Sequence, residues 1–254
     1  HAGGAATGGS GVVVLPCGAG KTVMGMAAMQ RVGAKTLILT TNTIAVRQWK
    51  QELKDKTELT EDQVGEYTGD RKEVRPVTIT TYQMVTWRRS KASSFEHLAL
   101  FGMENWGLVI YDEVHLLPAP VFRVTAELQA RRRLGLTATL VREDGREDEV
   151  FCLIGPKRYD VPWKVLEGQG FIASAQCVEV RVPLDEEERV RYVSAGSRSK
   201  FRIASENPAK TAVVRRILSL HEGDRVLIIG QYIDQVKGLA RDLQVPLIMG
   251  KTPQ

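Results

Sequence analysis

The sequence predicts an α/β protein built on a parallel β-sheet, and three observations lead to this fold class. Short apolar runs alternate with longer amphipathic segments along the 254 residues. The spacing of these runs fits βαβ units, in which a helix joins two parallel strands. Two of the runs end in residues suited to phosphate and metal binding, and ligand sites of α/β proteins lie at the carboxyl ends of strands.

The elements of the first 155 residues follow from this alternation. Apolar runs predict strands at residues 11–15, 36–40, 77–80, 108–111 and 134–138. Helical periodicity predicts helices over residues 23–30, 44–53 and 121–130.

A glycine-rich loop follows the first predicted strand: Pro16-Cys17-Gly18-Ala19-Gly20-Lys21-Thr22. Backbone N–H groups converge on a phosphate only where no side chain blocks them, and a helix that starts near Lys21 adds its positive dipole end. We therefore predict that the loop binds ATP, with Lys21 on the β- and γ-phosphates and the Thr22 hydroxyl on Mg²⁺. Leu15 stands where the common template has glycine, so the loop is shorter. A glycine-rich turn with an incidental lysine is the alternative.

Two adjacent carboxylates end the strand predicted at residues 108–111. Asp112 is expected to hold Mg²⁺ through water, and Glu113 to polarise the attacking water. His115 is expected to sense the γ-phosphate or to pass a signal on, with a histidine satisfied inside the loop as the alternative. Lys21, Asp112, Glu113 and His115 are thus the predicted catalytic residues, and an acidic turn is the alternative for the carboxylates.

Several further segments carry a resemblance to a known family. Leu136-Thr137-Ala138-Thr139 looks like the coupling segment of superfamily 2 helicases. Together with Asp112-Glu113-Val114-His115, the following Arg142-Glu143-Asp144 and Ile154-Gly155-Pro156-Lys157, it resembles the XPB family of DNA repair and transcription helicases. The match runs from about Gly11 to the last residue and looks like a prokaryotic member. A charged surface loop is the alternative for Arg142-Glu143-Asp144.

The resemblance implies RecA-like domains, Mg-ATP hydrolysis stimulated by DNA, and 3′-to-5′ movement. It implies that phosphate state is coupled to domain position through Thr137, Thr139, Arg142, Glu143, Asp144 and Gln231. It places DNA contacts at Thr41, Asn42, Arg47, Gln48, Thr80, Thr81 and Tyr82. An exposed helix start is the alternative for Arg47 and Gln48.

The expected organisation is a RecA-like ATP-binding domain over residues 1–155, a connector over 156–176 and a partial second RecA-like domain over 177–254. The second domain is expected to contain strands at 177–182, 225–229 and 247–249 and helices at 211–220 and 232–243. A polar, basic stretch at 185–207 resembles a thumb-like insertion that touches DNA, or is a solvated helix and loop. An upstream Arg-x-Tyr-Gln segment and the later arginine-finger motifs of the family lie outside this sequence. We therefore expect a fragment that binds nucleotide weakly and hydrolyses ATP poorly or not at all.

The composition fits this interpretation without deciding it. Apolar residues make up 43% and charged residues 26%, as in ordinary globular chains, and the net charge of +5 mildly favours a nucleic-acid partner. Three widely spaced cysteines predict neither a metal site nor a disulfide framework. No apolar run approaches membrane-spanning length, so no membrane partner is expected. A cytoplasmic, nucleoid-associated location is expected for a prokaryotic protein.

The expected partner is single-stranded or forked DNA, with a repair nuclease or a transcription-repair complex as protein partners. Two other functions stay open. One is a different superfamily 2 motor, such as a restriction-enzyme translocase or an RNA helicase. The other is an inactive nucleotide-binding fragment or switch.

Overall fold

The structure, a computed structural model, describes residues 9–90, 92–117, 119–138 and 147–250. The chain divides into two compact units, residues 1–175 and residues 176–254. Thr139 and Arg142-Glu143-Asp144, predicted to couple phosphate state to domain position, lie outside the described residues. None of the helices in the described ranges has the length and apolar character that a membrane crossing needs.

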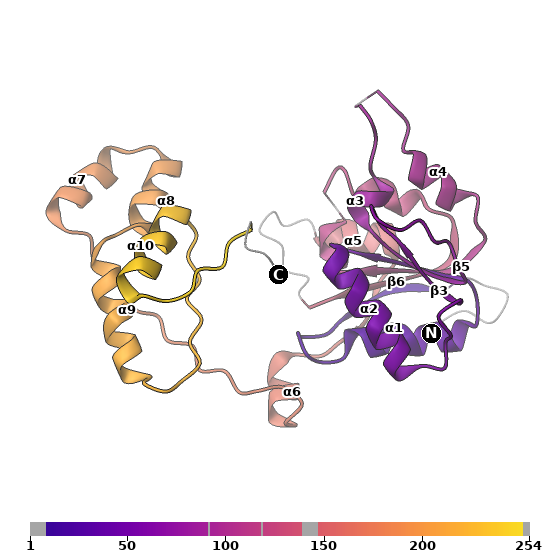
Figure 1. Ribbon diagram of the computed structural model, residues 1–254, viewed down its shortest axis with the longest axis horizontal. Helices are drawn as coiled ribbons and strands as arrows, with labels where there is room; N and C mark the ends of the chain where they lie inside the picture. Colours follow the sequence, from indigo (N-terminus) through magenta and orange to yellow (C-terminus); the bar gives the residue numbers. More distant parts are fainter. Residues whose placement is uncertain (1–8, 91, 118, 139–146, 251–254) are drawn as a thin grey trace. The chain divides into compact units, whose positions relative to one another are not determined.

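Unit 1 is a parallel sheet with helices on both faces (Figure 1). The strand order is β3-β4-β2-β5-β6-β1-β7, and every pairing is parallel. Its strands are β1 (Ser10–Val14), β2 (Thr36–Thr40), β3 (Val64–Tyr67), β4 (Val77–Thr81), β5 (Trp106–Asp112), β6 (Ala130–Thr137) and β7 (Lys157–Asp160). Its α-helices are α1 (Lys21–Val32), α2 (Thr43–Lys56), α3 (Tyr82–Val85), α4 (Glu96–Gly102), α5 (Glu147–Ile154) and α6 (Trp163–Gly168). The prediction of a parallel α/β fold is confirmed.

Successive residues of each strand point to opposite faces of the sheet, and their side chains pack into two apolar cores, one on each face. Leu37 and Leu39 of β2 face the core that α3, α4 and α5 cover, whereas Ile38 faces the core under α1 and α2. Both faces are therefore buried, and such strands are apolar along their whole length. This explains why the central strands were recognisable from the sequence.

The segment predicted as a helix over residues 121–130 is different in the structure. It contains a short 3₁₀ helix, Arg123–Glu127, and β6 has already begun at Ala130. Ala130 and Arg132 pair with Trp106 and Leu108 of β5. The backbone ladder of the sheet thus overrides the local helical periodicity, and the arginines that follow Ala130 lie on a strand.

α1 and α2 approach each other closely because Gly25 of α1 has no side chain. A Cβ atom on Gly25 would lie 2.5 Å from Cη2 of Trp49, a buried residue of α2. Trp49 cannot easily move away, since its Nε1 donates a hydrogen bond to Oδ2 of Asp112 at 2.9 Å. Gly25 therefore fixes the position of the helix that reaches the end of β5.

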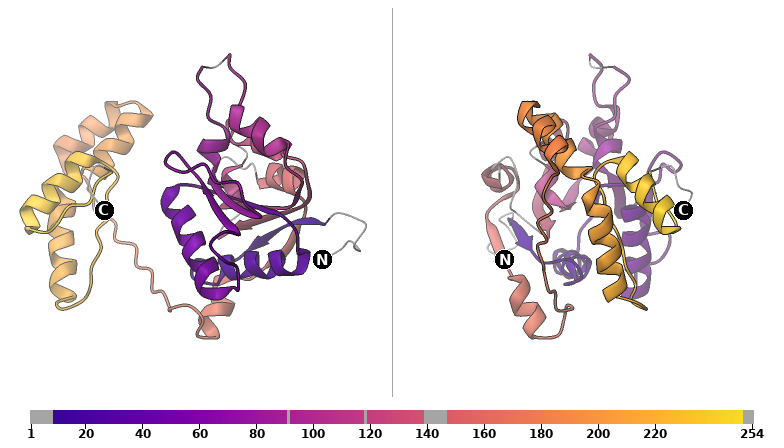
Figure 2. Two further views of the ribbon diagram at one scale, coloured as in Figure 1. Left: turned by 45° about the vertical axis from the view of Figure 1, so that its right-hand side comes forward. Right: turned by 90° about the vertical axis from the view of Figure 1, so that its left-hand side faces the viewer.

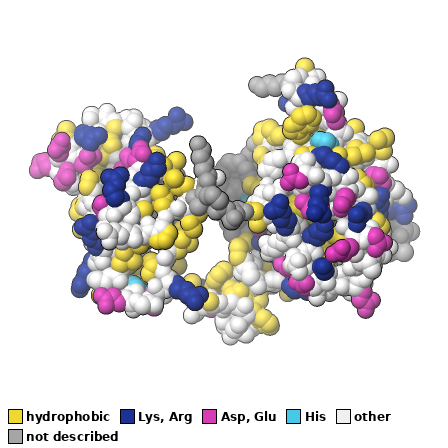
Figure 3. Space-filling view, viewed as in Figure 1, with side chains coloured by type: hydrophobic (Ala, Val, Ile, Leu, Met, Phe, Trp, Pro, Cys, Tyr) yellow, Lys and Arg dark blue, Asp and Glu magenta, His cyan; other side chains and the backbone are white. Residues whose placement is uncertain are grey.

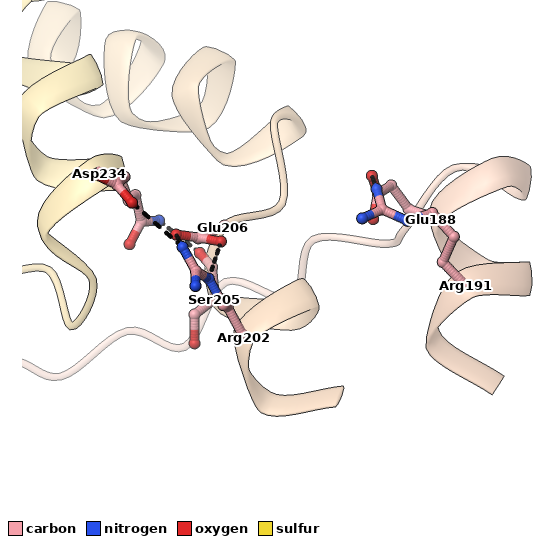
Figure 4. A network of polar contacts seen from close by, with 7 residues as sticks. Glu188, Arg191, Arg202, Ser205, Glu206 and Asp234 are labelled. Carbon is pink, nitrogen blue, oxygen red and sulfur yellow. Dashed lines mark hydrogen bonds and ion pairs between the residues drawn. The ribbon is translucent and has the colours of Figure 1, made fainter. Parts of the chain in front are cut away.

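Unit 2 consists of four helices in the described residues: α7 (Glu186–Ser194), α8 (Ser197–Ser205), α9 (Ala209–Leu220) and α10 (Ile233–Leu243). A polar network joins α8 to the start of α10 (Figure 4). Arg202 contacts Glu206 at 2.8 Å and Asp234 at 3.2 Å, and Gln235 donates to the carbonyl oxygen of Ser205 at 2.5 Å. The Arg202 contacts are exposed ion pairs, so each contributes little on its own, whereas the Gln235 hydrogen bond is partly buried.

The three strands predicted in unit 2 are absent from its described part. Residues 177–182, 225–229 and 247–249 form no ladder there, although their sequences are apolar. A strand exists only through hydrogen bonds with a neighbouring strand. Apolar side chains of these segments are consequently exposed, for example Leu227 at 77% and Ile229 at 85%.

Replacing Gly25 with alanine is expected to lower the free energy of unfolding of unit 1 by about 1–3 kcal/mol, because the added methyl group overpacks against Trp49. The usual gain of about 1 kcal/mol for Gly→Ala in a helix then becomes a loss. Urea unfolding, followed by circular dichroism, measures the effect. The matched control is Gly102→Ala in α4, where nothing lies within 4 Å of the added atom. Equal stability changes in the two variants would contradict the packing argument.

Candidate functional site

The glycine-rich loop lies between β1 and α1, and its two glycines have left-handed backbones. Gly18 has φ 79° and Gly20 has φ 84°, which L side chains rarely adopt. Gly20 is also the N-cap of α1, a helix of 12 residues without an acidic residue in its first turn. No carboxylate in the first turn of α1 itself competes for the backbone N–H groups at this helix end. The loop is therefore suited to hold an anion such as phosphate.

Lys21 begins α1 and points to the end of β5. Its Nζ lies 2.7 Å from Oε1 of Glu113, and both side chains are partly buried. Glu113 itself has a left-handed backbone with φ 52° and ψ 51°. Such a conformation costs roughly 1–2 kcal/mol for a residue other than glycine and is typical of functional sites. The predicted phosphate-binding lysine and the predicted catalytic carboxylate are thus brought together.

Asp112 is held by hydrogen bonds from two other elements. Trp49 of α2 donates to its Oδ2 at 2.9 Å, and the backbone N–H of Glu113 donates to its Oδ1 at 3.1 Å. The hydroxyl of Tyr82 in α3 donates to the backbone carbonyl of Asp112 at 2.8 Å. Burial raises the pKa of the Asp112 carboxyl in spite of the bond from Trp49. A nearby cation would relieve this penalty, because it favours the ionised carboxylate.

Glu113 has the opposite electrostatic environment. The hydrogen bond from His115 and the contact with Lys21 lower its pKa from 4.5 to about 2. The His115 ring nitrogen Nδ1 lies 3.3 Å from Oε2 of Glu113 and 2.9 Å from the hydroxyl of Thr137. The Thr137 hydroxyl, in a residue predicted to couple phosphate state to domain position, is therefore hydrogen-bonded to the acidic loop. Its role in coupling stays a prediction.

β6 connects the two halves of the site because it lies between β1 and β5. The carbonyl oxygen of Thr137, at the end of β6, accepts a hydrogen bond from Leu15 N–H at 2.9 Å. The hydroxyl of the same threonine contacts His115. The acidic loop can approach β6 closely because Gly135 leaves room for Val114. The methyl groups of Val114 lie 3.0 Å from the position that a Cβ atom on residue 135 would occupy. Thr137 thus touches both the strand before the phosphate loop and the acidic loop.

The residues predicted to contact DNA fall into two groups. Asn42, Arg47 and Gln48 are exposed around the start of α2, and Thr41 is half-buried. Asn42 is also the N-cap of α2, since its side chain accepts from Ala45 N–H at 2.9 Å. Direct DNA contact by these four residues stays a prediction.

The second group needs a correction. Thr80 is fully buried and its hydroxyl donates to the carbonyl oxygen of Tyr67, while fully buried Tyr82 bonds to Asp112. Neither side chain can reach DNA in this structure. Thr81 is also buried, and its hydroxyl caps α3 by accepting from Met84 N–H at 3.1 Å. The hydroxyls of the threonines stabilise backbone at the strand end, and Tyr82 holds the end of β5.

Two residues of the site were not predicted in these roles. Trp49 forms an apolar stripe with Val46 and Leu53 on α2. This stripe predicts that Trp49 packs in the core, but it does not predict the hydrogen bond from Trp49 to Asp112. Tyr82 was predicted to face DNA, and nothing in its sequence context indicates the bond to the carbonyl of Asp112. Gln231, predicted to act in coupling, is exposed in unit 2.

The oxygen atoms at the site suit Mg²⁺. Thr22 supplies a hydroxyl and Asp112 a carboxylate, and Mg²⁺ typically takes one or two such protein oxygens beside substrate phosphates and water. No cluster of three or more histidine, cysteine, aspartate or glutamate side chains that could hold a metal occurs in the described part of the chain. The residues therefore fit a metal that binds together with a nucleotide rather than one held in a protein cage.

The chain is similar to known protein families and to curated proteins. Residues 6–142 match the family described as "Type III restriction enzyme, res subunit", and residues 166–254 match "ERCC3/RAD25/XPB C-terminal helicase". Two curated proteins named "DNA 3'-5' helicase XPB", from Kineococcus radiotolerans and Mycobacterium tuberculosis, are 61% and 60% identical to this chain over 245 residues. These alignments cover 96% of this chain and 44% of each relative. The chain thus spans less than half the length of these relatives.

A solved structure supports the fold. The Hef helicase domain of Pyrococcus furiosus matches with a TM-score of 0.50 and 18% identity, over 94% of this chain and 50% of that chain. At this identity the likeness concerns the fold alone.

The low pKa of Glu113 predicts a pH dependence of stability. Because the folded pKa is about 2 and the ordinary value is 4.5, the ionised carboxylate stabilises unit 1 above about pH 5, and this contribution is lost as the pH falls toward 2. The contribution is about 3 kcal/mol. Glu113→Gln removes it while keeping the size of the side chain.

Urea unfolding at several pH values measures the difference. Between pH 5 and pH 3, the unfolding free energy of the wild type is expected to fall more steeply than that of Glu113→Gln. Between pH 8 and pH 9 the two curves should run parallel. Asp112 has a raised pKa and contributes the opposite slope in both proteins, and this opposite slope is smaller in Glu113→Gln because the Glu113 charge is one cause of the rise. Identical slopes below pH 5 would show that Glu113 is not stabilised as described.

Proposed function

The chain belongs to the XPB family of superfamily 2 helicases, and on that premise we propose that it is the nucleotide-binding part of an ATP-driven DNA helicase or translocase that moves 3′ to 5′. The observation that carries the proposal is the direct contact between Lys21 and Glu113. This contact joins a phosphate-binding loop to a catalytic carboxylate. A nucleotide switch that does not hydrolyse its ligand needs the phosphate-binding loop but not the carboxylate. We further propose DNA repair, or repair linked to transcription, as its setting and the cytoplasm of a prokaryote as its location.

Lys21 has two alternative partners in this proposal. Without nucleotide it pairs with Glu113, and with nucleotide its ammonium group contacts the β- and γ-phosphates instead. The first turn of α1 and the backbone of Gly18 and Gly20 bind the remaining phosphate oxygens. Binding therefore exchanges one ion pair for another, which limits the cost of taking the lysine out of water.

Glu113 then orients the attacking water. A carboxylate with a pKa of about 2 is ionised at neutral pH, so it accepts a hydrogen bond well but takes up a proton poorly. When Lys21 moves to the phosphates, one of the causes of the low pKa is removed. The basicity of Glu113 consequently rises when the substrate is in place. His115 keeps its contact with the second oxygen and holds the side chain in position.

Thr22 and Asp112 would hold Mg²⁺, which when bound neutralises charge on the phosphate oxygens. Trp49 keeps the Asp112 carboxylate in place. The same helix α2 presents Arg47 and Gln48 to solvent. We propose that DNA bound at the start of α2 acts on Asp112 through Trp49, which gives a short physical route for stimulation of hydrolysis by DNA.

Nucleotide binding and hydrolysis test the proposal. Lys21→Ala is expected to weaken Mg-ATP binding about tenfold or more, because a charge-assisted contact is lost. Glu113→Gln should retain binding and lower hydrolysis by about 10²-fold or more. Calorimetric titration measures binding. Lys54→Ala, which removes an exposed lysine of α2, is the control and should bind normally.

Hydrolysis is compared with and without single-stranded DNA, on this chain and on a longer chain carrying the rest of the sequence that the XPB relatives have. DNA-stimulated hydrolysis that depends on both Lys21 and Glu113 supports the motor. Unchanged binding in Lys21→Ala would refute it.

The direction of movement distinguishes this motor from a second candidate. Residues 6–142 match a family named after a restriction-enzyme subunit, which favours a translocase that does not separate strands as the second candidate. The longer chain is given duplexes with a 3′ or a 5′ single-stranded tail, and a triplex as a probe of translocation. Unwinding of the 3′-tailed duplex alone is expected. Displacement of the triplex strand with neither duplex unwound would favour the translocase.

A further inference from the structure

The chain between α3 and α4 forms a loop that projects from unit 1 (Figures 1 and 2). It follows Thr86, which caps the end of α3, and leads to Phe95, which precedes α4. The sequence after Thr86 is Trp87-Arg88-Arg89-Ser90-Lys91, so three basic residues follow the tryptophan within four positions. Position 91 is not among the described residues. We call residues 87–90 and 92–95 the basic loop, and Figure 3 shows basic and hydrophobic side chains together at this end of the unit.

Trp87 is anchored on one side and open on the other. Trp87 is 45% exposed, and its backbone N–H donates a hydrogen bond to the carbonyl oxygen of Met84 at 3.3 Å. Its ring lies beside that of His97, with centroids 5.8 Å apart and planes inclined by 46°. The indole therefore keeps a defined place while it offers apolar ring surface to solvent.

The support under Trp87 reaches into the core. Nδ1 of His97 lies 2.9 Å from the hydroxyl of Tyr67, and the Tyr67 ring packs edge-on against Phe101 with centroids 4.9 Å apart. Tyr67 and Phe101 are buried. Burial, and to a lesser extent the Lys72 ammonium, lowers the pKa of His97, so its ring is neutral at pH 7. The stack beneath the indole is thus a neutral aromatic one.

Lys72 contacts this stack, and two further cationic side chains lie in the basic loop. The Lys72 ammonium lies 4.7 Å from the centre of the Tyr67 ring, and the Arg88 guanidinium lies 4.9 Å from that of Phe95. Arg89 contacts Glu96 at 3.6 Å, a long contact between exposed side chains that contributes little. Lys72, Arg88 and Arg89 are all exposed. Their charge is complementary to a polyanion.

The basic loop lies at the same edge of the sheet as the phosphate loop. Tyr67 ends β3, and α3 directly follows β4 and bonds to Asp112 through Tyr82. In the strand order β3-β4-β2-β5, β3 is three strands from β5, or about 14 Å at the usual strand spacing. The start of α2, with its proposed DNA contacts, follows β2 between them. The basic loop therefore extends one continuous edge rather than forming a separate surface.

We propose that Trp87 stacks on an unpaired base of single-stranded DNA while Arg88 and Arg89 contact the phosphates beside it. This inference rests on the proposed function and adds a site to it. An aromatic face next to cationic groups binds single strands with little sequence preference, since every base has a π-face and each phosphate releases counterions. A blunt duplex offers no unpaired base, so stacking on Trp87 distinguishes single strands from duplexes.

Tryptophan fluorescence can detect this stacking directly. Trp49 and Trp106 are buried, whereas Trp87 and Trp163 are exposed to similar degrees, 45% and 42%. In a Trp163→Phe background, an oligothymidine of about 15 nucleotides should quench the fluorescence. Adding Trp87→Phe should remove the quenching. Trp163→Phe alone is the matched control and should bind the oligonucleotide with the affinity of the wild type.

Affinity measurements complete the test. Trp87→Ala is expected to weaken oligothymidine binding about tenfold or more, Trp87→Phe to weaken it less, and neither to change binding to a blunt duplex. The double change Arg88→Ala and Arg89→Ala should reduce the slope of log affinity against log salt by about 0.7 for each lost phosphate contact. If Trp87→Ala does not fold, Trp87→Phe and the arginine variant still provide the answer.

Two outcomes overturn the inference in different ways. If the wild type binds oligothymidine, Trp87→Ala binds it equally well, and the quenching persists in Trp87→Phe, the basic loop is not a stacking site and the proposed function stands. If the wild type binds no single-stranded DNA in either assay, the proposed function fails and the inference fails with it.

Discussion

The parallel ladders that β6 forms with β1 and with β5 determine where every group of the nucleotide site lies. The phosphate loop follows β1, and Asp112 and Glu113 lie at the end of β5, but β1 and β5 are not neighbours in the sheet. β6 fills the space between them and places Thr137 at the common edge, where it bonds to Leu15 on one side and to His115 on the other. A shift of one residue in either ladder would turn these side chains to the opposite face. The chemistry of the site thus depends on backbone hydrogen bonds before it depends on any side chain.

The two neighbouring carboxylates of the site are kept in different states by their surroundings. Asp112 is partly buried, and burial raises its pKa, whereas Glu113 is paired with His115 and Lys21, and its pKa is lowered. Pairs of titratable groups whose environments act in opposite directions are typical of sites with divided roles. Asp112 would thus gain from a nearby metal ion, whereas Glu113 already has a cationic partner, Lys21. The left-handed backbone of Glu113 helps to point the two side chains to different neighbours.

The fold of unit 1 and the centre of the site were accessible from sequence because both rest on local patterns. Buried parallel strands are apolar throughout, and a glycine loop that ends in lysine needs only its flanking strand and helix for recognition. The roles of Trp49 and Tyr82 were not accessible, since a helical stripe or a tyrosine after a strand looks the same whether or not it bonds to Asp112. The misassigned segment at residues 121–130 and the short edge strands β3 and β7 have the same cause. Their conformation is decided by pairing with strands distant in sequence, which overrides local preference.

The contrast in burial between the two units has a thermal consequence. Unit 1 contains two apolar cores, whereas between residues 176 and 250 the structure buries only Leu239 and Asn207. The heat capacity change of unfolding comes from apolar surface newly exposed to water, at about 0.45 cal/K/mol for each Å². Unfolding of unit 1 therefore supplies nearly all of this heat capacity change. Its stability curve therefore bends strongly with temperature, and unit 2 adds little to this curvature.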